Sequence, residues 1–249
     1  MATRREVIED LRRQIEQLGG TFRPRKSLPF GVGALDRHLP GNGLALGSLH
    51  EVVETGPASE FAGAATLFVA GIAARLKGPI LWCLTRRDLF TPGLLHVGLH
   101  PDRVIYVETY RDADVLPLLE EGLHEKGLGA VVGEVTRLSL TTSRRLQLAA
   151  EASGVPALVI RRWWTVAQKD LTTLPTAAST CWRIAPVVSK ALPADGIIRG
   201  RWRVELVRCR GAEPHSWILE ACDAQGRLAL PSDMADGSDS AKIRGAASG

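Results

Sequence analysis

The chain has 249 residues, of which 45% are hydrophobic and 23% are charged, and its formal net charge is +4 at pH 7. This length and apolar content are typical of a globular protein with a substantial buried core, and they exclude a fibrous or largely disordered chain. The small positive charge allows contact with nucleic acid or an acidic partner without requiring either.

Membrane-spanning, secreted and metal-binding proteins are not indicated. The longest apolar stretch, residues 61–74, is rich in Ala and Gly and is too short to span a bilayer. The N-terminus runs directly into a charged amphipathic segment, without an apolar signal region, so we expect a cytoplasmic protein. The cysteines are scattered and have no histidine nearby at metal-ligand spacing, which favours reduced, mostly buried thiols. They are Cys83, Cys181, Cys209 and Cys222.

The first predicted element is an amphipathic helix over residues 4–18. Apolar side chains recur there at three- and four-residue steps, and Gly19 and Gly20 end the pattern. This stripe must be buried against the chain's own core or against a partner. Its members are candidates for partner binding or self-association: Ile8, Leu11, Ile15 and Leu18. A basic linker follows, so that residues 1–26 precede the core.

Residues 27–231 are predicted to form one α/β core. Short apolar runs alternate with segments of helical length, as in a mainly parallel sheet covered by helices on both faces. The expected strands are residues 49–54, 80–84, 104–107, 130–135 and 157–160, and the expected helices lie near 58–77, 88–98, 112–126 and 142–153.

The pattern changes after Trp164. Strand-like runs at residues 179–187, 199–210 and 215–222 are joined by short turns. They predict an antiparallel C-terminal extension of the sheet. The tail, residues 232–249, is rich in Ser, Gly, Asp and Ala, and we expect it to be flexible.

Gly-rich segments surround the first expected core strand. Residues 28–36 read Leu-Pro-Phe-Gly-Val-Gly-Ala-Leu-Asp, a second Gly-rich turn occupies residues 39–48, and the strand 49–54 leads to Gly56. This order and spacing resemble the entry to a RecA-family core, in which similar pieces precede the first strand and its phosphate-binding loop. An unrelated α/β protein with glycines in its turns is the alternative.

The phosphate-binding loop is degenerate. A working loop, Gly-x-x-x-x-Gly-Lys-Ser/Thr, binds phosphates through backbone N–H groups and a lysine, and its hydroxyl binds Mg²⁺. Here six residues separate Gly56 from Gly63. Ala64 and Ala65 replace the lysine and the hydroxyl, and Glu60 adds negative charge. Phosphoryl transfer depends on positioning and electrostatic stabilisation, so we expect no catalytic residue, no cofactor and no ATP hydrolysis.

Two further positions of the RecA pattern are altered. The family carries a water-activating glutamate after the second core strand, where this chain has Thr85, Arg86 and Arg87. Glu134 lies near the position of the family's metal-orienting aspartate, the Walker B position. A metal site at Glu134 stays open, but the loss of its partners favours a structural or solvated role.

The pattern over residues 28–230 resembles the ImuA proteins, RecA-like accessory factors of DNA damage-induced mutagenesis. Residues 28–36, 43–51, 131–134, 201–210 and 216–220 carry the resemblance, together with the degenerate loop. It implies a non-catalytic member of a mutasome in the SOS response, acting in translesion synthesis with ImuB, a Y-family-like protein, and an error-prone polymerase. The same core also resembles SulA-type cell-division inhibitors, which bind FtsZ. An atypical DNA-dependent ATPase is a third interpretation.

Two groups of arginines are candidate contacts for DNA or an acidic partner. The period of two in residues 199–210 places Arg199, Arg201 and Arg203 on one strand face, opposite the apolar side chains. Arg161 and Arg162 end the last core strand and precede two tryptophans, a combination of cations and stacking surfaces. A solvated strand face and buried tryptophans are the alternatives.

Overall fold

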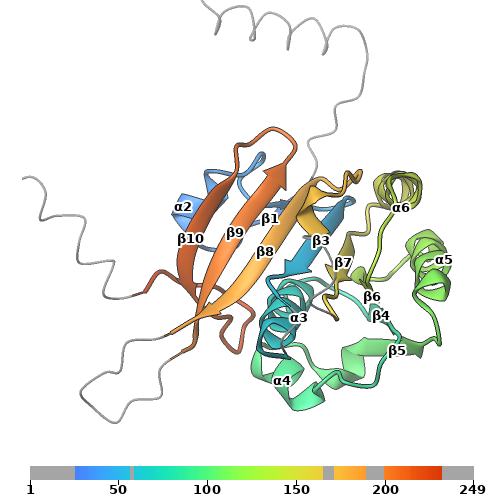
Figure 1. Ribbon diagram of the computed structural model, residues 1–249, viewed down its shortest axis with the longest axis horizontal. Helices are drawn as coiled ribbons and strands as arrows, with labels where there is room; N and C mark the ends of the chain where they lie inside the picture. Colours follow the sequence, from blue (N-terminus) through green and yellow to red (C-terminus); the bar gives the residue numbers. More distant parts are fainter. Residues whose placement is uncertain (1–25, 57–58, 165–170, 189–198, 232–249) are drawn as a thin grey trace, which may run out of the picture.

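The computed structural model describes residues 26–56, 59–164, 171–188 and 199–231 (Figure 1). Three predictions lie outside these residues: the helix bearing Ile8, Leu11, Ile15 and Leu18, most of the basic linker, and the tail from residue 232 onward.

One mixed sheet of eight strands organises the described chain, in the order β10-β9-β8-β3-β7-β6-β4-β5. The strands are β3 (Leu49–Glu54), β4 (Ile80–Leu84), β5 (Val104–Glu108), β6 (Ala130–Val135), β7 (Ala157–Arg161), β8 (Thr180–Val187), β9 (Arg201–Cys209) and β10 (His215–Glu220). β8 runs parallel to β3, whereas β9 and β10 are antiparallel to their neighbours. The predicted α/β class is confirmed, and the antiparallel part begins at β9, one strand later than predicted.

Helices cover both faces of the parallel part of the sheet (Figure 1). α3 (Ser59–Ala74) and α4 (Thr91–His96) pack on one face, and α5 (Asp112–His124) and α6 (Leu140–Ser153) pack on the other. The α3 face buries the largest side chains, among them Phe68, Trp82 and Trp182. On the opposite face α5 lies close to β6, because a Cβ atom on Gly133 would lie 2.4 Å from the Leu119 side chain.

The Gly-rich segment before β3 forms a small subsheet and a short helix. These elements are β1 (Ser27–Leu28), α2 (Gly33–Asp36) and β2 (Leu44–Ala45). The Asp36 carboxylate accepts hydrogen bonds from the backbone N–H groups of Phe30 at 2.6 Å and Gly31 at 2.9 Å. Gly31 has a φ of 85°, a backbone conformation that favours glycine. This turn places the Phe30 ring 5.5 Å from that of Trp182, in the core of the α3 face.

The alternation predicted for the late strand is confirmed in β9. Trp202, Val204 and Leu206 are buried on the α3 face, whereas Arg203 is exposed on the other. Short 3-10 helices occupy Pro101–Arg103 (η1) and Leu171–Thr173 (η2).

The prediction that the cysteines are mostly buried thiols is confirmed. Cys83, Cys181 and Cys222 are buried free thiols, and Cys209 is partly buried. No helix within the described ranges is both long and apolar enough to cross a bilayer.

Candidate functional site

The degenerate loop is shorter than predicted. α3 begins at Ser59, so Gly63, Ala64 and Ala65 lie inside this helix and not in the connection that follows β3. These residues belong to the helix predicted near residues 58–77, and the degenerate motif does not extend the connection as far as Ala65. The Ala-rich sequence has high helix propensity, which allows the helix to begin early. Ala64 and Ala65 are 5% and 0% exposed and belong to the core of the α3 face.

An aromatic ring covers the glycine at which the loop begins. An ideal Cβ atom on Gly56 would lie 3.0 Å from the ring of Phe61. A phosphate-binding loop depends on backbone N–H groups that a phosphate can approach closely. In this protein the Phe61 ring packs against Gly56, so the backbone there contacts an apolar side chain.

Four buried residues form an ion-pair cluster where the parallel strands end at their carboxyl edge, called here the Arg162 cluster: Glu54, Trp82, Glu134 and Arg162. Arg162 donates to Glu134 Oε2 at 2.5 Å and 2.8 Å and to Glu54 Oε1 at 2.7 Å. Trp82 Nε1 donates to Glu134 Oε1 at 2.8 Å, and the backbone N–H of Trp163 donates to Glu54 Oε2 at 2.7 Å. All four carboxylate oxygens therefore have hydrogen-bond partners.

The topology of the sheet explains why these residues meet. Glu54 ends β3, Glu134 lies near the end of β6, and Arg162 directly follows β7, which lies between these two strands. The three side chains point to the α3 face, where Arg162 Nη1 also donates to the carbonyl oxygen of Ala62, in the first turn of α3, at 3.4 Å. The guanidinium group thus joins three strands and the helix that follows the loop.

Burial and ion pairing shift the pKa values of the cluster in opposite directions. The side chains of Glu54, Glu134 and Arg162 are between 2% and 4% exposed. Burial raises the pKa of Glu134, and the Arg162 guanidinium and the Trp82 hydrogen bond counteract that shift. Burial would lower the pKa of Arg162, but the carboxylates of Glu134 and Glu54 raise it overall.

The cluster is negatively charged overall, and its carboxylates are internally paired. Two carboxylates and one guanidinium give the ionised cluster a net charge of −1, which repels polyphosphate. The acidic residue at the Walker B position, Glu134, is engaged on both oxygens and 3% exposed. Across the ranges that the structure describes, no three His, Cys, Asp or Glu side chains gather as metal ligands would.

Arg86 lies beside the Arg162 cluster. Its guanidinium carbon is 4.1 Å from the centre of the Trp164 ring, and that of Arg162 is 6.0 Å from the same centre. The residues after β4 therefore place a cation against an aromatic ring, where the RecA pattern has a catalytic glutamate.

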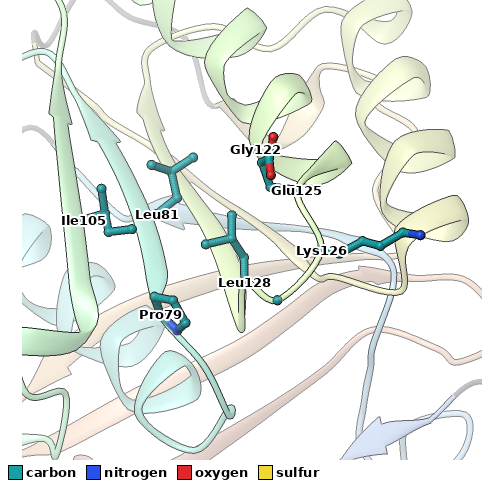
Figure 2. A pocket seen from close by; sticks show the side chains of 8 residues that line it. Pro79, Leu81, Ile105, Gly122, Glu125, Lys126 and Leu128 are labelled. Carbon is teal, nitrogen blue, oxygen red and sulfur yellow. The ribbon is translucent and has the colours of Figure 1, made fainter.

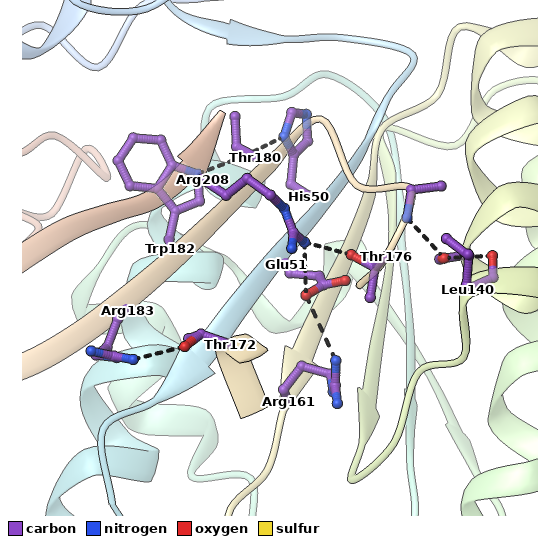
Figure 3. Close-up of polar contacts among 12 residues, drawn as sticks. His50, Glu51, Leu140, Arg161, Thr172, Thr176, Thr180, Trp182, Arg183 and Arg208 are labelled. Atoms are coloured by element: carbon purple, nitrogen blue, oxygen red, sulfur yellow. Dashed lines mark hydrogen bonds and ion pairs between the residues drawn. The ribbon is translucent and has the colours of Figure 1, made fainter. Parts of the chain in front are cut away.

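Arg161 occupies a second buried cluster, on the opposite face of the sheet (Figure 3). Its side chain is 0% exposed, and its Nη1 lies 3.7 Å from Glu51 Oε2. Arg208, 35% exposed, approaches the same carboxylate at 3.9 Å and donates to Thr176 Oγ1 at 2.6 Å. Burial lowers the pKa of Arg161, and the carboxylate of Glu51 counteracts the shift. Arg161 and Arg162 thus face opposite sides of the sheet, and neither guanidinium is exposed.

The three arginines of the late strand differ in exposure. Arg199 pairs with Glu220 at 3.3 Å and donates to the carbonyl oxygens of Ala221 and Arg227. Arg201 is partly buried and Arg203 is exposed. The structure therefore does not bring the candidate arginines into one surface, and Arg203 is the most accessible of them.

The sequence reasoning missed two members of the Arg162 cluster, Glu54 and Trp82, and the pairing of Arg162 with Glu134. One signal was present: Glu54 and Arg162 each end or follow an apolar strand, where a charge must be paired if it is buried. The partners themselves were not identifiable, because Arg162 is 28 residues from Glu134 and 108 from Glu54 along the chain.

This chain aligns with known proteins over most of its length. It is 40% identical over 213 residues to Protein ImuA of Caulobacter vibrioides (strain NA1000 / CB15N), an alignment that spans 82% of this chain and 87% of the relative. Protein ImuA of the strain ATCC 19089 / CIP 103742 / CB 15 matches with the same identity and coverage. A scan against known protein-family profiles finds no match. The identity and coverage show that the chain belongs to the ImuA family, which is associated with DNA damage-induced mutagenesis.

Proposed function

We propose that the protein is a non-catalytic, RecA-like accessory factor of translesion synthesis. In this role it works in a mutasome with an ImuB-like, Y-family-related protein and an error-prone polymerase. The membership of the ImuA family supports the setting, and the Arg162 cluster is the observation that supports the absence of catalysis.

The charges at this site oppose phosphoryl transfer. An ATPase needs a cation beside the transferred phosphoryl group and a carboxylate that is free to orient Mg²⁺. Here Arg162 neutralises Glu134 at 2.5 Å, inside the protein. The lysine and hydroxyl positions are Ala64 and Ala65, whose side chains pack in the core. A protein with this arrangement acts through its surfaces.

ATP hydrolysis tests the absence of catalysis. We expect the purified protein to show no turnover above that of buffer with ATP and Mg²⁺, whether or not single-stranded DNA is added. The matched control is Arg203→Ala, which removes an exposed arginine outside the Arg162 cluster and should give the same rate as the wild type. DNA-stimulated hydrolysis that is lost in Glu134→Gln would overturn the proposal, because it would assign Glu134 to a working site.

The partner is tested by a direct comparison. We expect immobilised protein to retain the ImuB-like protein from the same genome and not the cell-division protein FtsZ. Retention of FtsZ alone would support the SulA-type alternative and contradict a role in the mutasome.

A further inference from the structure

One face of the antiparallel part of the sheet is open to solvent. On the α3 face, β9 and β10 bury Trp202, Trp217 and Leu219. On the opposite face, α5 and α6 pack on the parallel strands, whereas the side chains of β9 and β10 are exposed or partly buried. The side chains of β8, β9 and β10 that point away from α3 form a surface called here the open face.

The open face carries an excess of positive charge. Its charged side chains are four arginines and two glutamates, and four positive and two negative charges give a net charge of +2: Arg183, Arg201, Arg203, Arg208, Glu205 and Glu220. Each glutamate already has an arginine partner, because Arg183 lies 3.4 Å from Glu205 and Arg199 lies 3.3 Å from Glu220. Arg203 is exposed and forms no ion pair with the residues that the structure describes. An additional acidic group can therefore bind at Arg203.

Apolar side chains flank Arg203 on the open face. Across the two ladders Arg203 lies opposite Ile218 of β10 and Ala185 of β8, and both are partly exposed. The tryptophans of these three strands all belong to the core on the α3 face: Trp182, Trp202 and Trp217. Single-stranded nucleic acid is bound largely by stacking its bases on aromatic side chains. The open face therefore suits a peptide whose carboxylates are interspersed with an apolar side chain better than it suits nucleic acid.

The chain itself contains such a peptide after Pro231. Residues 232–240 read Ser-Asp-Met-Ala-Asp-Gly-Ser-Asp-Ser, and the next lysine or arginine is Lys242. The three aspartates are three residues apart, and Met234 is the large apolar residue among them. A segment of this composition cannot form a core of its own, but a surface of opposite charge attracts it.

The described chain ends beside the open face (Figure 1). Glu220, the last residue of β10, donates its backbone N–H to the carbonyl oxygen of Ala229 at 2.8 Å, so the returning chain borders β10. Arg203 lies on β9, two strand spacings or about 10 Å from this returning chain. Asp236 follows Pro231 by five residues, which span up to about 17 Å when extended. The acidic segment can therefore reach the open face without movement of a described element.

An apolar groove beside β5 suits the acidic segment less well (Figure 2). β5 is at the opposite end of the sheet from β10, where the described chain ends. The groove is lined by apolar side chains such as Leu81 and Ile105, and its two charged residues, Glu125 and Lys126, have opposite signs. An acidic segment therefore gains no net attraction there.

We infer that residues 233–239 bind back onto the open face of their own chain. The aspartates lie against Arg203 and its neighbours on this face, and Met234 lies against Ile218. Exposed ion pairs are individually weak and are screened by salt, but the tether keeps the segment at a local concentration of about millimolar. The bound segment shields the open face from acidic segments of other molecules. This inference does not depend on the partners proposed above.

Cross-linking of the full chain tests the position of the segment. Arg203→Lys places an amine on the open face and keeps the charge. A carbodiimide at low salt should then couple position 203 to an aspartate of residues 233–239, as identified by mass spectrometry, and about 1 M salt should reduce the yield at least about fivefold. The matched control is Arg137→Lys, at an exposed arginine after β6, which should give no such product.

Three results of the cross-linking would contradict the inference. Arg203→Lys gives no coupled peptide, or Arg137→Lys gives the same yield, if the segment does not bind the open face. A coupled peptide found only in covalent dimers would assign the contact to a second copy of the chain.

Binding of a labelled oligo-aspartate peptide tests the shielding. The variant Asp233→Asn/Asp236→Asn/Asp239→Asn should bind the peptide at least about threefold more tightly than the wild type in fluorescence polarisation, because its own segment no longer competes. Adding Arg203→Ala to this variant should remove the gain.

The substitutions also change the net charge, so a charge-matched control is needed. Asp102→Asn/Glu121→Gln/Glu125→Gln removes the same charge from exposed positions elsewhere and should bind within about twofold of the wild type. An equal gain in the two triple variants, or no binding of the peptide by any of the proteins, would overturn the shielding whatever the cross-links show.

Discussion

Arg162 is the one cation of its cluster and forms ion pairs with two buried carboxylates, at 2.5 Å and 2.7 Å. We expect Arg162→Ala to lower the free energy of unfolding by about 3–5 kcal/mol, since it leaves Glu54 and Glu134 buried without a cation. Arg203→Ala, which removes an exposed arginine from β9, should change it by less than about 0.5 kcal/mol. Urea denaturation measures both, and equal losses in the two variants would contradict a structural role for the cluster.

The same cluster allows a second comparison. Replacing all three charged groups, in Glu54→Gln/Glu134→Gln/Arg162→Met, removes the unpaired charge that Arg162→Ala leaves behind. The triple variant should therefore be more stable than Arg162→Ala. Replacing every charge of a buried ion pair costs less free energy of unfolding than removing only one partner, which leaves the other charge buried and unpaired. A triple variant that is less stable than Arg162→Ala would show that the hydrogen bonds of the cluster, and not its charge balance, dominate.

His50 gives the protein a pH-dependent stability. Its Nδ1 lies 2.8 Å from Thr180 Oγ1 and its Nε2 lies 2.7 Å from the carbonyl oxygen of Ala45. Burial lowers its pKa from 6.5 to about 4, and the hydrogen bond to Ala45 opposes the shift. Between these two values the unfolded chain binds the proton more tightly than the folded chain, so stability falls as the pH falls.

The size of the effect follows from the shift in the pKa. The free energy of unfolding should fall by about 3 kcal/mol as the pH is lowered from 6.5 to 4, through His50 alone. His50→Gln cannot take up this proton, so its stability should depend less on pH in the same window. Denaturation curves at several pH values measure the difference. Parallel pH profiles for the two proteins would contradict the assignment.

At the scale of the element, α3 includes residues 63–65, which align with the end of the RecA-type phosphate-binding motif. Gly63 is a helical residue with open space around its Cα, so Gly63→Ala should raise stability by about 0.5–1 kcal/mol. Ala65→Lys should lower stability by several kcal/mol, because residue 65 is fully buried and a lysine there loses its hydration. Thermal and chemical denaturation test both. Tolerance of Ala65→Lys would mean that this turn of α3 opens easily.

Elements also show what the sequence could and could not predict. Short runs with many apolar side chains identified β3, β4 and β6 to the residue, because buried parallel strands are largely apolar on both faces. β3 departs from this pattern at His50, Glu51 and Glu54. The direction of β8 was not predictable, since a strand that pairs parallel on one side and antiparallel on the other has the same side-chain pattern. The helix predicted near residues 58–77 is confirmed by α3, because its Ala-rich sequence has high helix propensity.

At the scale of the whole molecule, the cysteines report on the integrity of the fold. Burial raises the pKa of Cys83, Cys181 and Cys222 to about 12, so these thiols stay protonated at neutral pH. Cys209 is partly buried, and its pKa is raised less by burial. A thiol reagent should therefore label Cys209 before the other cysteines in the folded protein, and all four in denaturant. Rapid labelling of Cys83 in buffer would indicate that the sheet opens near β4.

The Arg162 cluster also limits how the sequence can change. Nucleotide hydrolysis by the RecA-type residues would require a lysine and a hydroxyl at residues 64 and 65, which lie in α3, and the release of Glu134 from Arg162. Each of these changes made alone passes through a less stable chain, since it buries a new charge or leaves an old one unpaired. Under the proposed non-catalytic function, selection that acts on one substitution at a time therefore opposes a gain of nucleotide hydrolysis. In related chains, the arginine and its two carboxylates should accordingly be kept or replaced together.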